Sequence, residues 1–390
     1  MYSYSSKLSS FYLYNLNAEG ADRGSNYIPG LVPPGNPVTP VECLNTTCLP
    51  DNTTSVPSLS MGLSERALQV EKVGYVYVMP ALCVVCVVLN LLTILVFHQG
   101  AFRTPIYAYL TALAAADTVT GAVTLPVGMS RCSSCGVSYT EMVYEVFVFV
   151  PVSNMSEGAS AWFVVILAVE RLLAVTSISV DKTSATAKRR ARFVVVAVFV
   201  ASVLFNLPYF FVITIQRAPF PMAMQTKFGA SLAFDVFSWI RATLVQFAPL
   251  VVLIILNCFL LREVYRSSKR YQKLVRQGDA RNKAQQRLTW MLVGTVVLFI
   301  AGNIPVAFSY TILFGVVFGE TRSNDLYAIF RVITHLVAIA SYALDFVVYC
   351  GVNRHFRDAL TRSMSCKGLQ RKVSDVTPSS NKTNLTPTKY

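Results

Sequence analysis

Long apolar runs dominate the middle of the chain. Seven of them carry few or no charged residues, and they cover residues 74–97, 105–128, 146–169, 193–215, 242–261, 288–319 and 326–352. An apolar run of about 18 residues is long enough to cross a bilayer as a helix. Helices are favoured over strands because lipid offers no partner to open backbone groups. The pattern therefore predicts an all-α membrane protein built as a seven-transmembrane helix bundle.

Composition and charge agree with a chain embedded in a membrane. The protein is 54% hydrophobic and 14% charged, whereas about a quarter of the residues in a soluble domain are charged. The net charge is +14, and Lys and Arg concentrate in the segments that are cytoplasmic if the N-terminus lies outside. We therefore expect a multi-pass plasma-membrane protein with an extracellular N-terminus. Its basic loops suit the inner leaflet and cytoplasmic partners rather than nucleic acid.

This topology divides the chain into four segments. They are an extracellular tail at 1–72, the transmembrane bundle at 73–352, a short amphipathic eighth helix on the membrane surface at 353–366 and a disordered cytoplasmic tail at 367–390. Asn45 and Asn52 lie in Asn-Thr-Thr sequons, so we expect both to be glycosylated. In the eighth helix, apolar residues recur at a spacing of four from Phe356, which suits a membrane surface. Cys366 is a candidate for palmitoylation, with an unmodified thiol as the alternative.

Four of the nine cysteines lie in segments predicted to be extracellular, where disulfides persist. They are Cys43 and Cys48 in the tail and Cys132 and Cys135 in the first outer loop. Four cysteines allow three pairings, and the sequence does not choose among them. Two local pairs or free thiols are one interpretation, and a bridge from the tail to the loop is the other.

The third run ends in AVERLLAV, with Glu170 and Arg171 side by side. An acid–base pair at a helix end is ordinarily a solvated interface pair or a snorkelling arginine. Further residues stand out on other runs, namely Asn90 in LNLLTILV, Asp117 in LAAAD, Pro249, Pro305 and Tyr349. Over roughly residues 73–366, this ordered set resembles the landmarks of rhodopsin-like (class A) G-protein-coupled receptors. The resemblance implies that Glu170 holds Arg171 at rest and that Arg171 contacts a heterotrimeric G protein in the active state.

Departures from the family's usual motifs narrow the resemblance. The seventh run has Asp345-Phe346-Val347-Val348-Tyr349 in place of Asn-Pro-x-x-Tyr, and the sixth has Gly302-Asn303-Ile304-Pro305 in place of Cys-Trp-x-Pro. These variants resemble invertebrate neuropeptide receptors of the FMRFamide and myosuppressin kind. The residues that the resemblance assigns to activation and G-protein coupling are Glu170, Arg171, Asn303, Pro305, Asp345 and Tyr349. The family's disulfide from the third helix to the second outer loop is missing, because Val146 takes the place of its first cysteine.

Two carboxylates, Asp117 and Asp345, fall in the middle of predicted spans. A charge at that depth is costly unless it is paired or hydrated, so we expect a functional role. The resemblance implies an allosteric sodium site that these two residues form with Ser160 and Ser341. The alternative is that the two carboxyl groups share one proton. We expect no other cofactor.

The ligand site is expected among the outer halves of the third, fifth, sixth and seventh helices. The polar candidates there are Ser153, Glu157, Arg241, Gln246, Tyr310, Arg331 and His335. Arg331 and His335 are four residues apart and share a helix face. The alternative for Arg241 and Arg331 is that they only snorkel to outer headgroups. Glu157 lies too deep for that, so we favour a pocket role for it.

A receptor that transduces the binding of an extracellular neuropeptide to a G protein is the function that these observations favour. A chemosensory receptor for small molecules is the alternative, with the same fold and mechanism. A small transporter or channel is disfavoured because the chain shows no paired halves with broken helices. An enzyme is disfavoured because the histidines are scattered and no nucleophile–base spacing occurs. Arrestin, receptor kinases and membrane lipids are the other partners expected at the cytoplasmic face.

Overall fold

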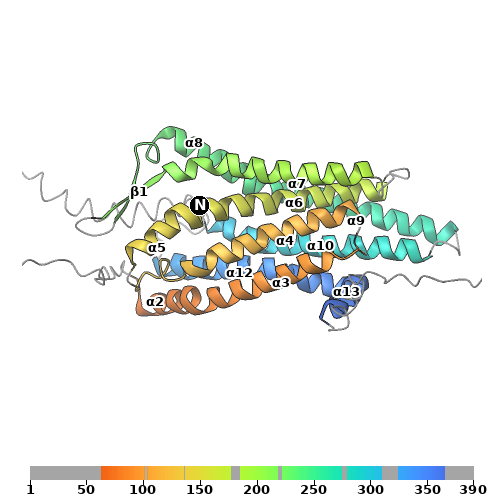
Figure 1. Ribbon diagram of the computed structural model, residues 1–390, viewed down its shortest axis with the longest axis horizontal. Coiled ribbons are helices and arrows are strands. Elements are labelled where there is room, and N and C mark those ends of the chain that lie inside the picture. The colour runs from red at the N-terminus through yellow and green to blue at the C-terminus, as the bar shows by residue number, and fades with distance from the viewer. Residues whose placement is uncertain are drawn as a thin grey trace, which may run out of the picture.

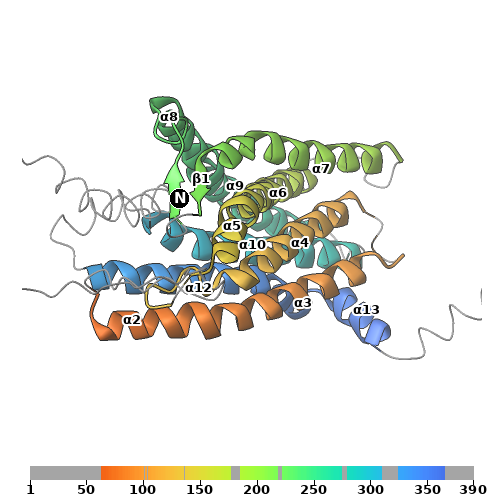
Figure 2. The same ribbon diagram turned by 60° about the vertical axis from the view of Figure 1, so that its left-hand side comes forward.

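A computed structural model describes residues 63–100, 102, 104–135, 137–176, 185–217, 222–274, 279–309 and 324–364. Within these residues, seven helices are long and apolar enough to cross a membrane, which confirms the predicted fold class. The helices run side by side along one axis (Figures 1 and 2). Six residues singled out above lie outside the described ranges, namely Cys43, Asn45, Cys48, Asn52, Tyr310 and Cys366.

The seven spans have the following bounds. The first joins α2 (Glu65–Lys72), η1 (Val73–Val78) and α3 (Met79–Phe97), and the second joins α4 (Pro105–Thr124) and η2 (Leu125–Val127). The third joins α5 (Tyr139–Tyr144), η3 (Glu145–Phe149) and α6 (Val150–Thr176), and the fourth joins α7 (Ala185–Asn206) and η4 (Leu207–Phe211). The fifth joins α8 (Leu232–Arg241), η5 (Ala242–Phe247) and α9 (Ala248–Leu274), while the sixth is α10 (Asp279–Phe308) and the seventh is α12 (Asn324–Val352).

Several helices extend beyond the apolar runs. The first span begins at Glu65, inside the segment expected to be a tail, because the Ser64 side chain accepts the Ala67 amide and caps the helix. The fourth span begins before its apolar run but also ends before the run does. Pro208 lies where α7 gives way to a short 3-10 turn, and Ile213–Gln216 form strand β1 instead of helix. Apolar runs thus locate the spans but do not fix where each helix ends.

A two-stranded hairpin, which the sequence did not predict, connects the fourth and fifth spans. Strand β1 pairs antiparallel with β2 (Met222–Gln225), with Gln216 opposite Met222. In Figure 1, β1, α2 and α5 lie at one end of the bundle and α13 (Arg354–Met364) at the other. We call these the α2 end and the α13 end.

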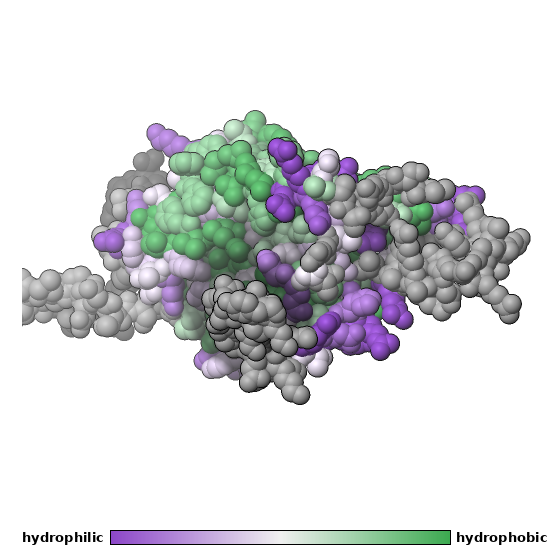
Figure 3. All heavy atoms as spheres, turned by 45° about the vertical axis from the view of Figure 1, so that its right-hand side comes forward, coloured by the Kyte–Doolittle hydropathy of each residue, from purple (hydrophilic) through white to green (hydrophobic). Residues whose placement is uncertain are grey.

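The third span lies at the centre of the bundle and the fourth at its edge. Ala159, Phe163 and Leu167 of α6 are all buried in the main core cluster. By contrast, Phe193 of α7 is 74% exposed and Val196 is 60% exposed. Figure 3 shows a broad patch of such hydrophobic residues on the face in view. In a bilayer these side chains face lipid, which accounts for an apolar exterior that water would not tolerate.

The sixth and seventh spans approach each other closely at Gly302. A Cβ on this residue would lie 2.3 Å from the Ser341 hydroxyl oxygen, so only glycine fits there. At the α13 end, the Phe356 side chain is fully buried and contacts the rings of Phe97 and Tyr349. This packing explains why α13 turns away from the seventh span and lies against the bundle, near the range predicted for an eighth helix.

Candidate functional site: polar networks along the bundle

Glu71 joins three elements at the α2 end. Its carboxylate accepts a hydrogen bond from Arg331 of α12 at 3.0 Å, and its second oxygen accepts the Ser133 backbone amide at 3.2 Å. The Glu71 side chain is fully buried and the Arg331 side chain is 15% exposed. The ion pair therefore lies inside the protein, where its two members satisfy each other's charge. Arg331 is not directed only to headgroups, as the snorkelling alternative required.

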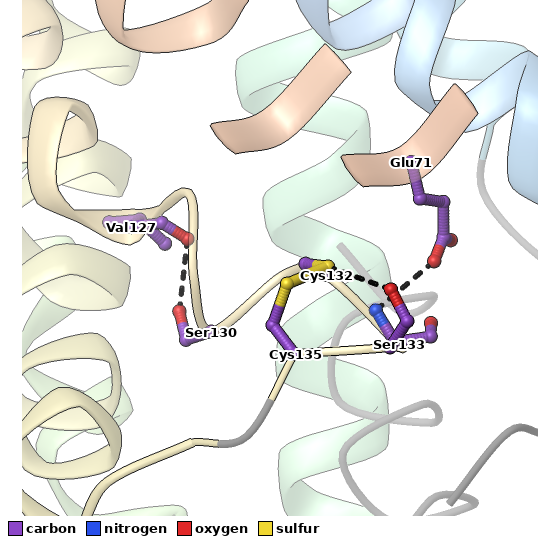
Figure 4. Close-up of a disulfide and its surroundings, with 7 residues drawn as sticks. Glu71, Val127, Ser130, Cys132, Ser133 and Cys135 are labelled. Carbon is purple, nitrogen blue, oxygen red and sulfur yellow. Dashed lines mark hydrogen bonds between the residues drawn. A yellow bond between two sulfur atoms is a disulfide. The ribbon is translucent and has the colours of Figure 1, made fainter. Parts of the chain in front are cut away.

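A disulfide closes the loop that carries Ser133 (Figure 4). It links Cys132 to Cys135, whose Cα atoms are 5.3 Å apart. The bridge from tail to loop is therefore wrong for these two cysteines, and the local pair is correct. The turn between them brings the Cα atoms within the separation that a disulfide needs. Cys132 is buried, so the bridge fixes the loop against the bundle and holds the Ser133 amide toward Glu71.

His335 lies near two donors, one on the first span and one in the loop after the second span. Its Nδ1 atom lies 3.1 Å from the Tyr75 hydroxyl and 3.1 Å from an Nη atom of Arg131. A guanidinium can only donate, so Nδ1 acts as the acceptor and the neutral ring carries its proton on Nε2. One network thus joins the predicted pair, Arg331 and His335, to the first span and to the loop after the second span.

Arg131 belongs to this network although it lies in a loop. Its Nε atom is 4.0 Å from a carboxylate oxygen of Glu145, and its guanidinium lies 4.7 Å from the centre of the Phe149 ring. Burial lowers the pKa of Arg131 to about 10, so the side chain stays charged at neutral pH. Sequence reasoning missed Arg131 and Glu71, because charged residues beside apolar runs are usually solvated.

The other ligand candidates fall into two groups. Arg241 donates from Nε to the Asn206 side chain at 2.9 Å and lies 5.3 Å from the centre of the Tyr209 ring. Gln246 donates to the Asn303 backbone oxygen at 3.0 Å, which joins the fifth and sixth spans. These contacts hold both residues inside the bundle.

Ser153 and Glu157 both lie on α6, but they differ in their surroundings. The Ser153 hydroxyl is buried and donates to the Val150 carbonyl of its own helix. Glu157 is half-buried. Among the described residues, its carboxylate has no hydrogen bond or ion pair.

The two mid-span carboxylates are buried, and each is near polar groups. Ser160 donates to Asp117 at 2.8 Å, which joins the second and third spans. One carboxylate oxygen of Asp345 is buried without a hydrogen-bond partner. Ser341 instead donates to the Ala338 carbonyl at 2.7 Å and lies against Gly302. All four predicted residues therefore carry oxygen atoms of the kind that a hard cation takes, with Asp117 and Ser160 in contact and an unmet oxygen at Asp345.

At the α13 end, the acid of the Glu170-Arg171 pair makes a different contact from the one implied by the resemblance. The Glu170 carboxylate lies 3.5 Å from Arg190 of α7. Arg171 is buried, and its Nε atom has no hydrogen-bond partner. Glu170 is the more exposed member of the adjacent pair, so its carboxylate reaches the neighbouring helix rather than the inward-facing arginine. Pro305 lies within α10, and Tyr349 is buried among the rings of Phe97 and Phe356.

Comparison with known proteins places this architecture in a family. The model of the 7 transmembrane receptor (rhodopsin family) matches residues 89–349. The Drosophila melanogaster sex peptide receptor is 26% identical over 349 residues, which cover 80% of this chain and 79% of the relative.

Two Caenorhabditis elegans proteins are similar over most of their length. Sex peptide receptor-related protein 2 is 25% identical, with 76% of this chain and 72% of the relative covered. A probable G-protein coupled receptor is 24% identical, with 77% of this chain and 71% of the relative covered.

The narrower resemblance to FMRFamide and myosuppressin receptors is not confirmed by these relatives. The family consists of receptors and not enzymes, and the match spans more than half of the chain. The chain therefore belongs to the rhodopsin family of seven-transmembrane receptors.

Proposed function

We propose that this chain is a cell-surface receptor for an extracellular peptide and that it activates a heterotrimeric G protein. In this proposal the α2 end is extracellular and the α13 end is cytoplasmic, as the distribution of Lys and Arg favours. Ligand binding enriches an active arrangement of the bundle, because the ligand binds that arrangement more tightly than the resting one.

The polar network at the α2 end carries the proposal. Four charged side chains, Glu71, Arg131, Glu145 and Arg331, meet there with His335 in the interior. A peptide has a donor and an acceptor at nearly every residue, so it can exchange hydrogen bonds with such a lining. A small apolar odorant would form no hydrogen bonds with these groups and would only remove water from those it covers, which costs affinity.

The names of the relatives point in the same direction. Two of the similar proteins are a sex peptide receptor and a protein related to it, and those names describe a receptor for a peptide. Identities of about a quarter do not carry the ligand over to this chain. They support the choice of peptides as the first class to test.

A G-protein dissociation assay in transfected cells tests the proposal. We would screen a peptide library beside amines and small odorants, with surface display checked by an N-terminal epitope on unpermeabilised cells. A peptide response that Arg171→Ala removes, at unchanged display, would support the proposal. A response to small molecules alone would replace it with a chemosensory function.

The α13 end is proposed to bind the cytoplasmic partners. Arg171 is buried inside the bundle there, and α13 presents Arg354 and Arg362 toward solvent. We propose that the G protein reaches Arg171 when the sixth span moves about Pro305. Anionic lipids would contact the basic residues of α13, and arrestin and receptor kinases would act at the same end.

We also propose that a sodium ion binds at mid-bundle and stabilises the resting state. The Asp117 and Asp345 carboxylates with the Ser160 hydroxyl would hold it. The unmet oxygen of Asp345 supports this assignment, because a buried carboxylate oxygen otherwise lacks any compensation.

A further inference from the structure

The loop after the second span carries two cysteines separated by two serines, in the order Cys132-Ser133-Ser134-Cys135. The disulfide between them spans a sequence separation of 3. A bridge over so short a separation restricts the unfolded chain less than one that closes a long loop, so chain entropy protects it less against reduction. This Cys-x-x-Cys spacing is also one that favours the thiolate form of a cysteine. Both features are typical of disulfides that open and close.

The two sulfur atoms of the bridge differ in access. Cys132 is 2% exposed, whereas Cys135 is only half-buried. Thiol–disulfide exchange requires a thiolate to attack one sulfur while the other sulfur leaves, and the attack falls where the thiolate can reach. The loop therefore presents Cys135 for attack and keeps Cys132 inside as the leaving sulfur.

The leaving sulfur has a hydrogen-bond donor beside it. The Ser134 hydroxyl lies 3.3 Å from the Cys132 Sγ atom. A disulfide sulfur carries no proton, so the hydroxyl is the donor, and it would stabilise negative charge that develops on Cys132. Arg131, which is charged at neutral pH, directly precedes Cys132 in the chain. A neighbouring cation also favours a thiolate over a thiol.

We propose that this disulfide is an exchange site for an extracellular low-molecular-weight thiol such as glutathione. The extracellular side and the effect on signalling rest on the proposed function. In the first step the incoming thiolate bonds to the Cys135 sulfur, the Cys132–Cys135 bond breaks, and its electron pair stays on Cys132. In the second step another thiolate attacks the small molecule's sulfur in the mixed disulfide and releases Cys135. The cysteine pair gains two electrons and the protons of the two thiols, which are oxidised to one disulfide.

The exchange acts on the polar network at the α2 end. Ser133 lies between the two cysteines, and its amide donates to Glu71 at 3.2 Å (Figure 4). The same Glu71 carboxylate accepts a hydrogen bond from Arg331 at 3.0 Å. Once the bridge opens, no covalent bond keeps the turn closed and the Ser133 amide in place. The lining that we propose for a peptide is then less preorganised, so reduction lowers peptide potency.

Trapping with isotopically labelled glutathione tests the site on intact cells and on the detergent-solubilised receptor. After an acid quench, the protein is denatured, free thiols are alkylated with a maleimide, and peptide mass spectrometry locates each adduct. We expect glutathione on Cys135 and the maleimide on Cys132. Ser134→Ala should slow the reaction about three- to tenfold, because the leaving sulfur loses its donor. Ser130→Ala is the matched control in the same loop, because that hydroxyl donates to the Val127 carbonyl at 3.0 Å instead (Figure 4).

Several results would overturn the proposal. Glutathione found on Cys132, or equal rates in Ser134→Ala and Ser130→Ala, would show that the attacked and leaving sulfurs are assigned wrongly. A bridge that opens only after the receptor has been unfolded would be a structural disulfide and not an exchange site. Adducts on the solubilised receptor but not on intact cells would place the loop away from the cell exterior and remove the extracellular thiol.

G-protein dissociation driven by an activating peptide measures the consequence for signalling. Pretreatment with glutathione should lower peptide potency several-fold on wild type at equal surface display. It should leave the potency unchanged in the double variant Cys132→Ser, Cys135→Ser, which has no bridge to open. Unchanged potency on wild type, with the bridge shown to be open, would overturn control of the network by the disulfide. Failure of every peptide would remove the proposed function, whereas the adducts alone would still decide whether exchange occurs.

Discussion

Arg331 lies 3.0 Å from Glu71, a residue 260 positions earlier in the chain, and the pair joins the first and seventh spans. The same carboxylate accepts the Ser133 amide, so the 128–138 loop is held by the same group. The third span has no cysteine at Val146 to anchor it to the loop between the fourth and fifth spans. In this protein, a buried ion pair at the α2 end joins elements that lie far apart in the sequence.

Removal of one member of this pair should destabilise the receptor. Glu71→Gln leaves the Arg331 charge buried, and breaking a buried pair costs about 3–5 kcal/mol. We expect a clear fall in the melting temperature of the detergent-solubilised protein and reduced surface display. Glu65→Gln on the same helix is the matched control, because Glu65 is exposed. In the double variant Glu71→Gln, Arg331→Met, stability should partly return, and no return would show that the ion pair is not the cause.

Loss of the loop disulfide should have a smaller effect. The bridge closes a loop with a sequence separation of 3, for which chain entropy gives a stabilisation of about 2 kcal/mol. We expect the double variant Cys132→Ser, Cys135→Ser to reach the surface and to melt at a lower temperature than wild type, yet at a higher one than Glu71→Gln. The single variants give the same loss if the cysteines pair only with each other. A complete loss of display in the double variant would contradict this ranking.

The fold followed from the sequence to a large extent, and the site to a lesser one. Apolar runs locate helices because only satisfied backbone can cross lipid, which sets a minimum length. The 213–225 hairpin was missed because its first strand continues an apolar run. Glu71 and Arg131 were missed because a charged residue beside an apolar run is usually solvated, and nothing in the neighbouring sequence distinguishes these two. Their partners, Arg331 and His335, come from the far end of the chain, and one sequence does not show that pairing.

Sodium should lower agonist potency through Asp117. If the ion stabilises the resting bundle, replacement of sodium chloride by an organic cation salt should raise the potency of an activating peptide several-fold, because an ion that favours the resting state opposes the active one. Asp117→Asn should abolish this salt dependence, since the amide lacks the charge that holds the ion. Asp358→Asn on α13 serves as the control, because Asp358 is exposed and far from the mid-span carboxylates. Equal salt dependence in wild type and Asp117→Asn would exclude the site.

The contact of Glu170 with Arg190 predicts an unequal effect of the two members of the Glu170-Arg171 pair. The Glu170 carboxylate contacts Arg190 at 3.5 Å, and the Arg190 side chain is 63% exposed, so this pair contributes at most about 1 kcal/mol. Glu170→Gln should therefore raise basal G-protein dissociation by less than about fivefold. Arg190→Ala should have an effect of the same size, since it removes the same contact. Arg171→Ala should abolish the response to an agonist at unchanged surface display. A large basal rise in Glu170→Gln without one in Arg190→Ala would show that Glu170 restrains Arg171 directly.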